Sequence, residues 1–415
     1  MMTNQLTVYL NTTKAGILER DGRLLTFSYS ADYLALPGAS PISRLLPLAS
    51  TVYGDEAAKA FFSNLLPEGA VLSQVARQVG ISQENVFGLL EAIGGDCAGA
   101  ISVSASDSLP EPTGGYRPIA EQELSAELDK LPSHPFLAGE EGVRLSLAGA
   151  QNKLPVFFDG SNYYIPEGAS PSSHILKTAI AQLDNSVINE TFCMTLAARL
   201  GLPVPAAQVV TIGDKQVFMV ERYDRKQSAS GDIVRLHQED FCQALGIPPE
   251  LKYEKEGGPG FGDCFRLVEE CSDEPMLDAG NILNWAIFNF IIGNADAHGK
   301  NLSFLYNEGH VRVAPFYDLI STAVYKRLNN KFAMKMGDQS DARYLPQDTL
   351  VKFAVEIGID IRTVRAAFIS LMDSIEAKSA QLLEEYRDRF GALVMLGEIA
   401  RVIDYRIAKG RTLVQ

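Results

Sequence analysis

Three polar residues, Asp296, Asn301 and Asp318, have the types and the spacing needed for phosphoryl transfer. Asn301 lies five residues after Asp296, and Asp318 lies seventeen residues after Asn301. In kinases, an aspartate of the catalytic loop accepts the proton of the substrate hydroxyl, while an asparagine of that loop and a later aspartate hold magnesium ions. The order and spacing therefore indicate a kinase site. The alternative is a polar surface loop, because Asn, Asp, Gly and His favour turns in any protein.

The elements on either side of this loop are expected to hold it rigid. The apolar runs 285–292 and 302–306 are typical of a helix and a strand, and the polar loop 293–301 connects them. Within the loop, Lys300 is well placed to neutralise charge on a transferring phosphoryl group. His298 is interpreted as a packing and hydrogen-bonding residue, because polar groups in loops usually find partners.

A turn of small residues at 146–153 reads Ser-Leu-Ala-Gly-Ala-Gln-Asn-Lys. It is expected between two strands, over 143–147 and 154–158. Small side chains let backbone N–H groups approach phosphate oxygens, and Lys153 could add positive charge. The pattern indicates a nucleotide loop, although an ordinary hairpin turn uses the same residue types.

Lys177 ends a predicted apolar strand over 173–177. In kinases, a lysine at such a place contacts the α- and β-phosphates and pairs with a glutamate on the following helix. Glu190 is the expected partner, because it lies near the start of a helix predicted over 187–200. A solvated strand end would also account for Lys177, and favourable charge at a helix N-terminus would also account for Glu190.

A charged segment at 220–225, Val-Glu-Arg-Tyr-Asp-Arg, stands where a kinase has the hinge between its lobes. Backbone groups of a hinge bind the adenine edge, and the apolar residues 218–220 would line the base pocket. A charged strand end is the alternative interpretation.

Composition is that of an ordinary globular protein: 415 residues, 46% of them hydrophobic and 21% charged. The longest apolar run is too short to span a bilayer, and the N-terminus lacks a signal core, so a cytoplasmic protein is expected. The five cysteines form no C-x-x-C pair and suggest neither disulfides nor a zinc site. The net charge of −14 opposes direct binding to nucleic acid or anionic membranes, although a basic partner could bring the chain to DNA.

The order of the expected elements predicts an α+β chain with a strand-rich part followed by a helical part. Residues 1–105 start with strands over 6–10 and 22–29, followed by helices over 54–66 and 70–79. Residues 106–140 have the composition of a linker with a short acidic helix at about 120–130. Residues 141–225 form a strand-rich lobe that also includes strands over 163–165, 207–212 and 216–221. Residues 226–415 are mostly helical and carry the Asp/Asn loop.

These motifs resemble those of the HipA-type serine/threonine kinase toxins of bacterial toxin–antitoxin pairs. The resemblance is colinear from about residue 140 to 325, weakens after about 330, and rests on ordered segments at 144–153, 173–177, 220–225, 236–246, 252–254, 257–260, 293–301 and 315–321. It implies a two-lobed protein-kinase-like fold with a strand-rich N-lobe and a helical C-lobe, preceded by a small N-terminal α/β subdomain. It also implies ATP and Mg²⁺ as cofactors.

The resemblance assigns roles to individual positions. Asp296 would be the catalytic base, Lys300 an electrostatic helper, and Asn301 and Asp318 the magnesium ligands. The cofactor-binding set would be Ala148, Gly149, Ala150, Gln151, Asn152, Lys153, Lys177, Glu221, Arg222, Tyr223, His298 and Tyr317. Ser146 matches the family's autophosphorylation site, where phosphate would add about −1.5 to −2 charges beside the nucleotide loop and switch the kinase off. The alternative for Ser146 is an ordinary strand residue with a locally satisfied hydroxyl.

The family resemblance also implies partners. These are a small helix-turn-helix antitoxin of the HipB type, operator DNA bound mainly through the antitoxin dimer, and a protein substrate in translation such as glutamyl-tRNA synthetase, with growth arrest and operon repression as results. Two other functions stay open: a small-molecule kinase of the same fold, and a catalytically silent corepressor. Intact Lys177, Asp296, Asn301 and Asp318 argue against the corepressor. The loop 148–153, the segment 236–246 and the N-terminal part argue against the small-molecule kinase.

Overall fold

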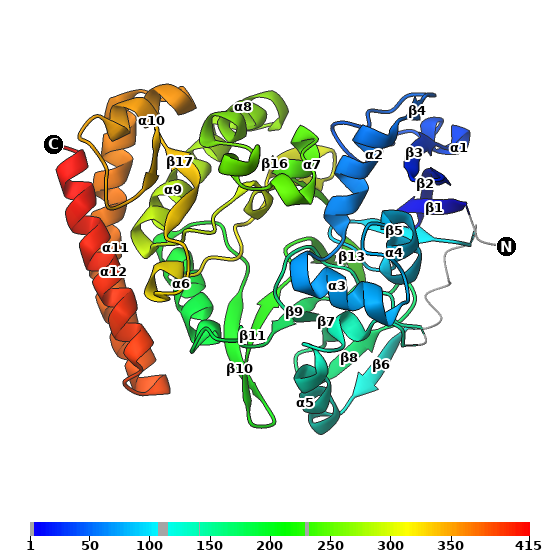
Figure 1. Cartoon of the computed structure of the whole chain (residues 1–415), viewed down its shortest axis with the longest axis horizontal. Coiled ribbons are helices and arrows are strands. Elements are labelled where there is room, and N and C mark those ends of the chain that lie inside the picture. The colour runs from blue at the N-terminus through cyan, green and yellow to red at the C-terminus, as the bar shows by residue number, and fades with distance from the viewer. Residues whose placement is uncertain (1–3, 107–114, 141, 229–231) are drawn as a thin grey trace. The chain divides into compact units, whose positions relative to one another are not determined.

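The computed structural model describes residues 4–106, 115–140, 142–228 and 232–415 (Figure 1). The chain forms two units. The first consists of Met1–Thr178, Val210–Glu250 and Leu305–His310, and the second of Ala179–Val209, Leu251–Phe304 and Val311–Gln415. The predicted α+β class is confirmed, because most strands lie in the first unit and most long helices in the second. In the described part of the chain, no helix is long and apolar enough to cross a membrane.

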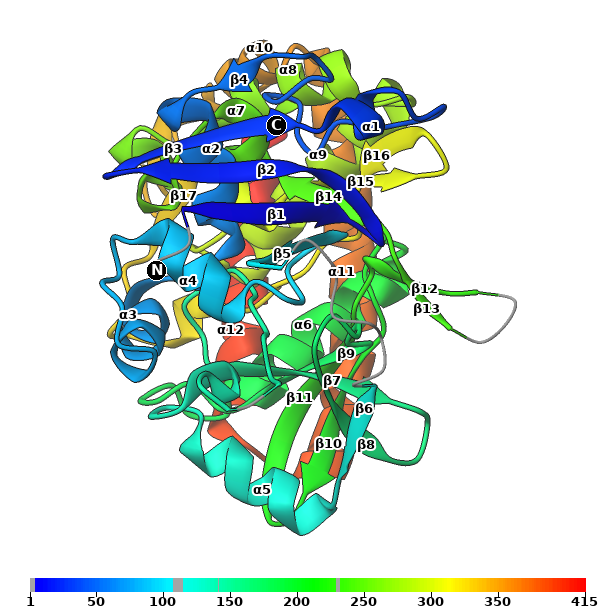
Figure 2. The ribbon, with the colours of Figure 1, turned by 90° about the vertical axis from the view of Figure 1, so that its right-hand side faces the viewer.

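The first unit begins with a five-stranded sheet in the order β4-β3-β2-β1-β5, whose strands lie side by side in Figure 2. The strands are β1 (Gln5–Leu10), β2 (Thr13–Asp21), β3 (Leu24–Tyr29), β4 (Val52–Tyr53) and β5 (Ile101–Ser104). The helices of this part are α1 (Ala31–Leu34), α2 (Asp55–Phe62), α3 (Gly69–Gln78) and α4 (Val86–Ile93). The consecutive residues 6–9 of β1, alternate residues of β3 and the phenylalanines of α2 are buried, with the rings of Phe27 and Phe62 5.6 Å apart.

A six-stranded sheet follows in the order β10-β11-β9-β7-β8-β6. Its strands are β6 (Tyr116–Ile119), β7 (Lys153–Phe158), β8 (Tyr163–Pro166), β9 (His174–Lys177), β10 (Ala207–Ile212) and β11 (Lys215–Glu221). The predicted acidic helix is α5 (Glu121–Lys130). The interval 106–140 thus supplies the edge strand β6 as well as this helix, and its residues 107–114 lie outside the described residues.

The strand predicted over 143–147 is wrong. The segment is extended, but its only strand-like contact among the described residues is a single parallel bridge between Leu145 and Asp96. Two backbone hydrogen bonds hold it there: Asp96 N–H to the Arg144 carbonyl at 2.9 Å, and Ser146 N–H to the Asp96 carbonyl at 3.1 Å. The apolar alternation of the segment therefore reflects burial against the N-terminal part of the chain and not a place in the sheet.

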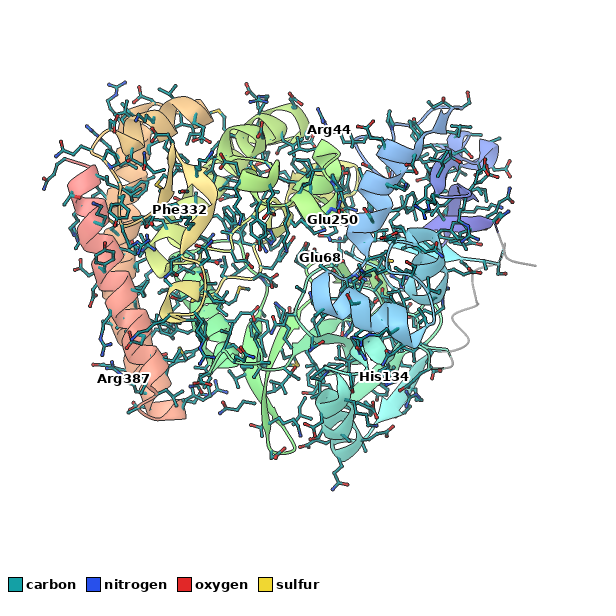
Figure 3. The ribbon with its side chains drawn as sticks, in the orientation of Figure 1. Arg44, Glu68, His134, Glu250, Phe332 and Arg387 are labelled. Atoms are coloured by element: carbon teal, nitrogen blue, oxygen red, sulfur yellow. The ribbon has the colours of Figure 1, made fainter. Side chains whose placement is uncertain are left out.

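Three short strand groups complete the list of strands. They are β12 (Arg225–Gln227) with β13 (Ile233–Arg235), β14 (His237–Asp240) with β15 (Ser303–Asn307) and β16 (His310–Val313), and β17 (Lys331–Met336) with β18 (Gln339–Asp341). After β14 comes the short helix α7 (Phe241–Leu245). The buried carboxylate of Glu239 in β14 accepts hydrogen bonds from the Ser43 hydroxyl at 2.8 Å and the Arg44 N–H at 3.0 Å, which ties β14 to the N-terminal part. Arg44 is labelled in Figure 3.

The second unit is built from long helices. They are α6 (Ser186–Leu200), α8 (Phe261–Cys271), α9 (Pro275–Ile292), α10 (Thr349–Ile357), α11 (Ile361–Phe390) and α12 (Val394–Leu413), of which α11 and α12 run side by side in Figure 1. As predicted, α6 ends at Gly201, whose left-handed φ of 83° caps the helix. The second half of α9 is buried around Trp285 and Phe288, so the loop that follows it starts from a rigid base.

Candidate active site

The small-residue turn at 148–152 leads into β7 and is closed by a lysine. The ammonium of Lys153 donates to the Ala148 carbonyl, across the five residues between them. Gly149 has φ +106°, and a Cβ there would come within 2.7 Å of Lys153 Nζ, so only glycine permits this close approach. The turn is therefore compact, with backbone groups and one positive charge gathered at the start of the strand.

The N-terminal part of the chain holds this turn in place. The Glu68 N–H donates to the Gly149 carbonyl at 3.1 Å, next to a parallel bridge between Pro67 and Gly149; Glu68 is labelled in Figure 3. The Ser146 hydroxyl donates to the Leu65 carbonyl at 2.8 Å, and Ser146 is completely buried. The turn is thus anchored on its first residues by 65–68, and the Ser146 hydroxyl has no access to solvent in this arrangement.

Lys153 and Lys177 face each other directly across the antiparallel pair β7–β9. Residues opposite each other in such a pair point to the same side of the sheet, so two ammonium groups share one face. Both side chains are buried, and Lys177 Nζ also lies 5.3 Å from the ring centroid of Phe218 on β11. Like charges in this position repel each other, and a phosphate placed beside them would offset that repulsion.

The hinge segment after β11 is fixed by the Arg222 side chain. Its guanidinium binds Asp96 at 3.1 Å, Asp224 at 2.8 Å and the Cys97 carbonyl at 3.0 Å, and 1% of the side chain is exposed. The predicted hinge residues are Glu221, Arg222 and Tyr223. The side chain of Arg222 is occupied by these contacts, so a nucleotide could bind only its backbone groups. Glu221 is exposed at the end of β11, and the Tyr223 hydroxyl donates to Gln238.

Arg222 belongs to a buried ion cluster, here called the Asp96 cluster, made of Asp96, Arg222, Asp224, Arg225 and Arg235. Asp96 receives all three arginines at 2.8–3.1 Å. Burial opposes ionisation of Asp96, but the three guanidinium groups and the Ser172 hydroxyl outweigh it and hold its pKa well below the usual range. The cluster joins the segment before β5 to the hinge.

The loop 293–301, which was predicted to be catalytic, starts where α9 ends at Gly293. This glycine has a left-handed φ of 70°, and a Cβ there would come within 2.8 Å of Val402 and Ala323 side-chain atoms. The Ala323 N–H donates to the Gly293 carbonyl at 2.9 Å, and the Ala295 N–H donates to the Thr322 hydroxyl at 2.7 Å. The loop and the segment after Asp318 are therefore tied together at the start of the loop.

Three buried asparagines add hydrogen bonds that hold the loop and the segment after Asp318 in place. The Asn294 amide donates to Asn289 on α9 at 2.8 Å and to the Asp318 carbonyl at 3.4 Å. The Asn189 side chain on α6 accepts from the Ser321 N–H and donates to the Ser321 carbonyl, both at 3.0 Å. Asp318 itself has φ 54°, a left-handed conformation that costs energy for a non-glycine residue and is often found at functional sites.

The predicted catalytic residues lie on this support. Asp296 is exposed, whereas His298, Lys300 and Asn301 are buried. The Asn301 side-chain oxygen accepts from the His298 N–H at 3.1 Å and keeps a second lone pair for a metal ion. The Tyr317 hydroxyl donates to the Lys300 carbonyl at 2.5 Å, which joins the loop to the residue before Asp318. The amide and carboxylate oxygens of Asn301 and Asp318 are the hard ligands that Mg²⁺ prefers.

Sequence reasoning assigned no role to Tyr253, although its segment was part of the resemblance. The Tyr253 hydroxyl donates to Asp296 Oδ1 at 2.6 Å, and its ring stands edge-on to His298 at 5.3 Å. The asparagine network was also missed, because Asn189 and Asn289 sit within helices, where a sequence pattern gives no sign of their partners. Glu190, the expected partner of Lys177, is buried in α6 of the second unit.

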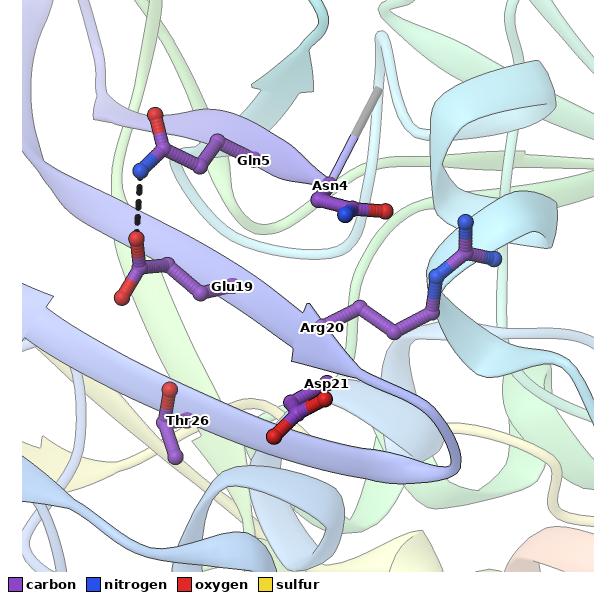
Figure 4. Close-up of a pocket in the computed structure, with 6 residues that line it drawn as sticks. All are labelled: Asn4, Gln5, Glu19, Arg20, Asp21 and Thr26. Atoms are coloured by element: carbon purple, nitrogen blue, oxygen red, sulfur yellow. Dashed lines mark hydrogen bonds between the residues drawn. The ribbon is translucent and has the colours of Figure 1, made fainter. Parts of the chain in front are cut away.

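Two other features lie away from these loops. Glu127, His134 and Glu140 bring possible metal-ligand atoms within 4.8 Å of one another (His134 is labelled in Figure 3). However, Glu127 already pairs with Lys130, and Glu140 with Arg117. A pocket on the five-stranded sheet is lined by Asn4, Gln5, Glu19, Arg20, Asp21 and Thr26 (Figure 4). Its lining is an ordinary mixed polar strand surface, and we assign chemistry to neither feature.

Comparison with known proteins gives matches along most of the chain. The family model of the HipA N-terminal domain matches residues 6–104, and that of the HipA-like C-terminal domain matches residues 145–379. A putative kinase of Sinorhizobium fredii is 40% identical over 369 residues, which is 88% of each chain. The serine/threonine-protein kinase toxin HipA of Shewanella oneidensis is 33% identical over 398 residues, covering 92% of this chain and 89% of that protein.

A solved structure shows the same similarity in three dimensions. It contains the HipA, HipB and operator DNA complex of the Shewanella oneidensis toxin–antitoxin system. This chain matches it with a TM-score of 0.84 at 30% identity, over 98% of this chain and 96% of that one. The similarity therefore covers the helices after residue 330, where the sequence motifs are weak.

Proposed function

The chain belongs to the HipA family, and we propose that it is an ATP- and magnesium-dependent serine/threonine protein kinase that acts as a toxin. The observation that most supports a working enzyme is the state of the loop 293–301. Its aspartate carboxylate is exposed, while the residues after it are buried and the loop is tied to the Asp318 segment through backbone and asparagine hydrogen bonds. A loop that had lost its catalytic role would have little reason to keep this support.

In the proposed mechanism, Asp296 accepts the proton of the acceptor hydroxyl as that oxygen attacks the γ-phosphorus of ATP. The bond from the γ-phosphorus to the β–γ bridging oxygen breaks, and ADP leaves with that oxygen. Asn301 and Asp318 would hold Mg²⁺, which neutralises charge on the phosphate oxygens when it is bound. Lys300 would add positive charge near the transferring group. The strained backbone of Asp318 is held by Asn294, so its carboxylate would be oriented before the metal binds.

On the nucleotide side, the lysine pair Lys153 and Lys177 would receive the phosphates. The backbone of residues 148–152 would approach the phosphate oxygens, which the glycine at 149 permits. Glu221 and Tyr223 would hold adenine through backbone groups, and the same holds for Arg222, because its guanidinium is committed to the Asp96 cluster.

We further propose that the kinase phosphorylates itself at Ser146 and is switched off by that phosphate. The hydroxyl is buried against the Leu65 carbonyl, so the segment must leave its place before it can reach an active site. A phosphate of about −1.5 to −2 charges cannot return to a site that faces a carbonyl oxygen. The turn 148–152 would then lose its contacts with 65–68 and no longer bind ATP.

The proposed partners follow the family resemblance. A basic helix-turn-helix antitoxin suits a chain with a net charge of −14, and operator DNA would be bound mainly through that antitoxin dimer, with repression of the operon as the result. The proposed substrate is a protein of translation, with glutamyl-tRNA synthetase as the first one to test. Its phosphorylation would arrest growth.

Intact-mass spectrometry of phosphatase-treated protein incubated with Mg-ATP tests the proposal. The wild type should gain one phosphate, mapped to Ser146, and Asp296→Asn should gain none. Asp404→Asn, an exposed aspartate on α12, serves as the matched control and should behave as the wild type. A wild type that gains no phosphate would favour a silent corepressor, and phosphate on other residues only would contradict the role of Ser146.

A further inference from the structure

The hydroxyl of Tyr253 and the carboxylate of Asp296 form a short hydrogen bond, 2.6 Å from oxygen to Oδ1. The two residues are 43 positions apart in the chain, so the contact is a product of the fold and not of local sequence. Asp296 is exposed, and an interaction between exposed side chains seldom keeps one geometry unless the backbone and the rings of both residues are held in place. Whether Tyr253 is held decides whether the bond has a role.

The backbone around Tyr253 is fixed by its neighbours. The Tyr253 carbonyl accepts from the N–H groups of Glu256 and Gly258, both at 2.9 Å. The next residue, Glu254, accepts from the Lys335 N–H at 2.6 Å and pairs with the Lys335 ammonium at 3.0 Å. The tyrosine is thus anchored to β17 through the residue beside it.

The tyrosine ring is fixed as well. It stands edge-on to the His298 ring of the catalytic loop, with 5.3 Å between centroids. The ammonium groups of Lys252 and Lys255 lie 5.4 Å and 5.6 Å from its centroid. These contacts hold the backbone and the ring in place, and they direct the hydroxyl towards Asp296.

We propose that Tyr253 is a positioning residue that orients the carboxylate of Asp296 for proton acceptance. The inference rests on the proposed function, in which Asp296 is the base. One oxygen of the carboxylate is fixed by the tyrosine hydroxyl, and the other, Oδ2, is presented to the acceptor hydroxyl. The arrangement follows the general logic of a catalytic base that a third group orients.

An aromatic ring and several cationic side chains lie close to this pair. His298 lies against the tyrosine ring, Lys252 and Lys255 lie over it, and Lys300 is on the same loop as Asp296. Replacing Tyr253 by Phe removes the hydroxyl and leaves these neighbours in place, so a change in rate would report on the hydroxyl alone.

The test compares self-phosphorylation rates of wild type, Tyr253→Phe, Tyr253→Ala and Asp296→Asn, all treated with phosphatase first. Tyr253→Phe should lower the rate at saturating Mg-ATP about ten-fold, a part of the 10²–10⁴-fold typical of general base catalysis. The Mg-ATP concentration at half-maximal rate should change less than about two-fold, because a positioning role acts on the chemical step. Tyr344→Phe, which alters an exposed tyrosine, is the control and should leave the rate unchanged.

The outcomes separate the two proposals. A purely structural role of the ring predicts that Phe restores the activity lost in Tyr253→Ala, whereas positioning predicts that Phe stays impaired. A wild-type rate in Tyr253→Phe, with Asp296→Asn inactive, would overturn the positioning role alone. A faster Tyr253→Phe would also overturn it, since the hydroxyl would then be blocking the acceptor. An active Asp296→Asn would overturn the proposed base, and the positioning role with it.

Discussion

Arg222 and Asp96 form an ion pair that is almost completely removed from solvent, with 3.1 Å between Nη1 and Oδ2 and 1% of either side chain exposed. The two residues are 126 positions apart and connect the segment before β5 to the hinge after β11. Two more arginines reach the same carboxylate, so the Asp96 cluster holds three guanidinium groups against the carboxylates of Asp96 and Asp224.

Asp96→Asn should destabilise the protein strongly. The change leaves three buried guanidinium groups with one carboxylate, and removing one partner of a buried pair typically costs about 3–5 kcal/mol. Urea unfolding measures this as a lower midpoint. Asp404→Asn, on an exposed helix face, should shift the unfolding free energy by less than about 0.5 kcal/mol. A loss of the same small size in both variants would contradict the importance of the cluster.

The stabilising effect of Asp96 should vanish in acid. Its folded-state pKa lies below the unfolded value of about 3.9, so the folded state favours the ionised form. The contribution is therefore fully present above that value and decreases as the pH falls from it towards the lower folded-state pKa. The difference between the unfolding free energies of wild type and Asp96→Asn, measured between about pH 6 and pH 2, should become smaller towards the acid end. A constant difference across this range would be inconsistent with the lowered pKa.

Asn189→Ala should weaken catalysis more than nucleotide binding. The side chain satisfies both backbone groups of Ser321, three residues after Asp318, and its loss leaves buried polar groups unpaired at a cost of about 1–3 kcal/mol. The segment carrying Asp318 should become less well placed for its metal. Self-phosphorylation rates and the melting temperature report the two effects. Equal rates in wild type and variant would show that this support is dispensable.

Lys177→Met should abolish the stabilisation that Mg-ATP gives the wild type. A ligand at a hundred times its dissociation constant stabilises a folded protein by about 2.7 kcal/mol, and a melting experiment detects this as a rise in the midpoint. The variant removes one of the two ammonium groups on the β7–β9 face. Lys226→Met, at an exposed lysine paired with Glu308, should keep the full shift. A full shift in Lys177→Met would place the phosphates elsewhere.

Much of the fold could be predicted from local patterns. The two-lobed HipA fold named from ordered motifs is confirmed by the family models and by the solved structure. Helix α6 with its glycine cap, the acidic helix α5 and most strands of the six-stranded sheet lie close to their predicted bounds. These elements carry their own signals, such as apolar periodicity, caps and prolines.

The errors have a common cause. Residues 143–147 alternate like a strand, but their burial comes from Asp96 and Leu65, which are distant in sequence. Strand β2 was missed because its ends are polar and it contains Gly16, where a Cβ would come within 2.2 Å of the Ser28 carbonyl. In both cases the structure depends on contacts with residues that are distant in sequence, and the local pattern of apolar residues does not reveal such contacts.

In the candidate site, too, some residues could be predicted from local motifs and others could not. The residues predicted to act on substrate belong to short motifs. Of the residues that hold them, Asn189 and Tyr253 lie 132 and 43 positions from the residues that they bind. Asn289 is in the helix just before the loop, five positions from its partner Asn294. Their roles follow from contacts, which a single sequence does not encode in any readable pattern.

The chain passes between its two units five times, after residues 178, 209, 250, 304 and 310. On the ribosome, the first unit can therefore be completed only when residues 305–310 have emerged, including Tyr306, whose hydroxyl binds the buried carboxylate of Glu239. Domains generally fold as units during synthesis, and here neither unit can close from a contiguous stretch of nascent chain. A product that ends before residue 305 would accordingly lack part of both units, and one that ends after residue 310 would still lack part of the second.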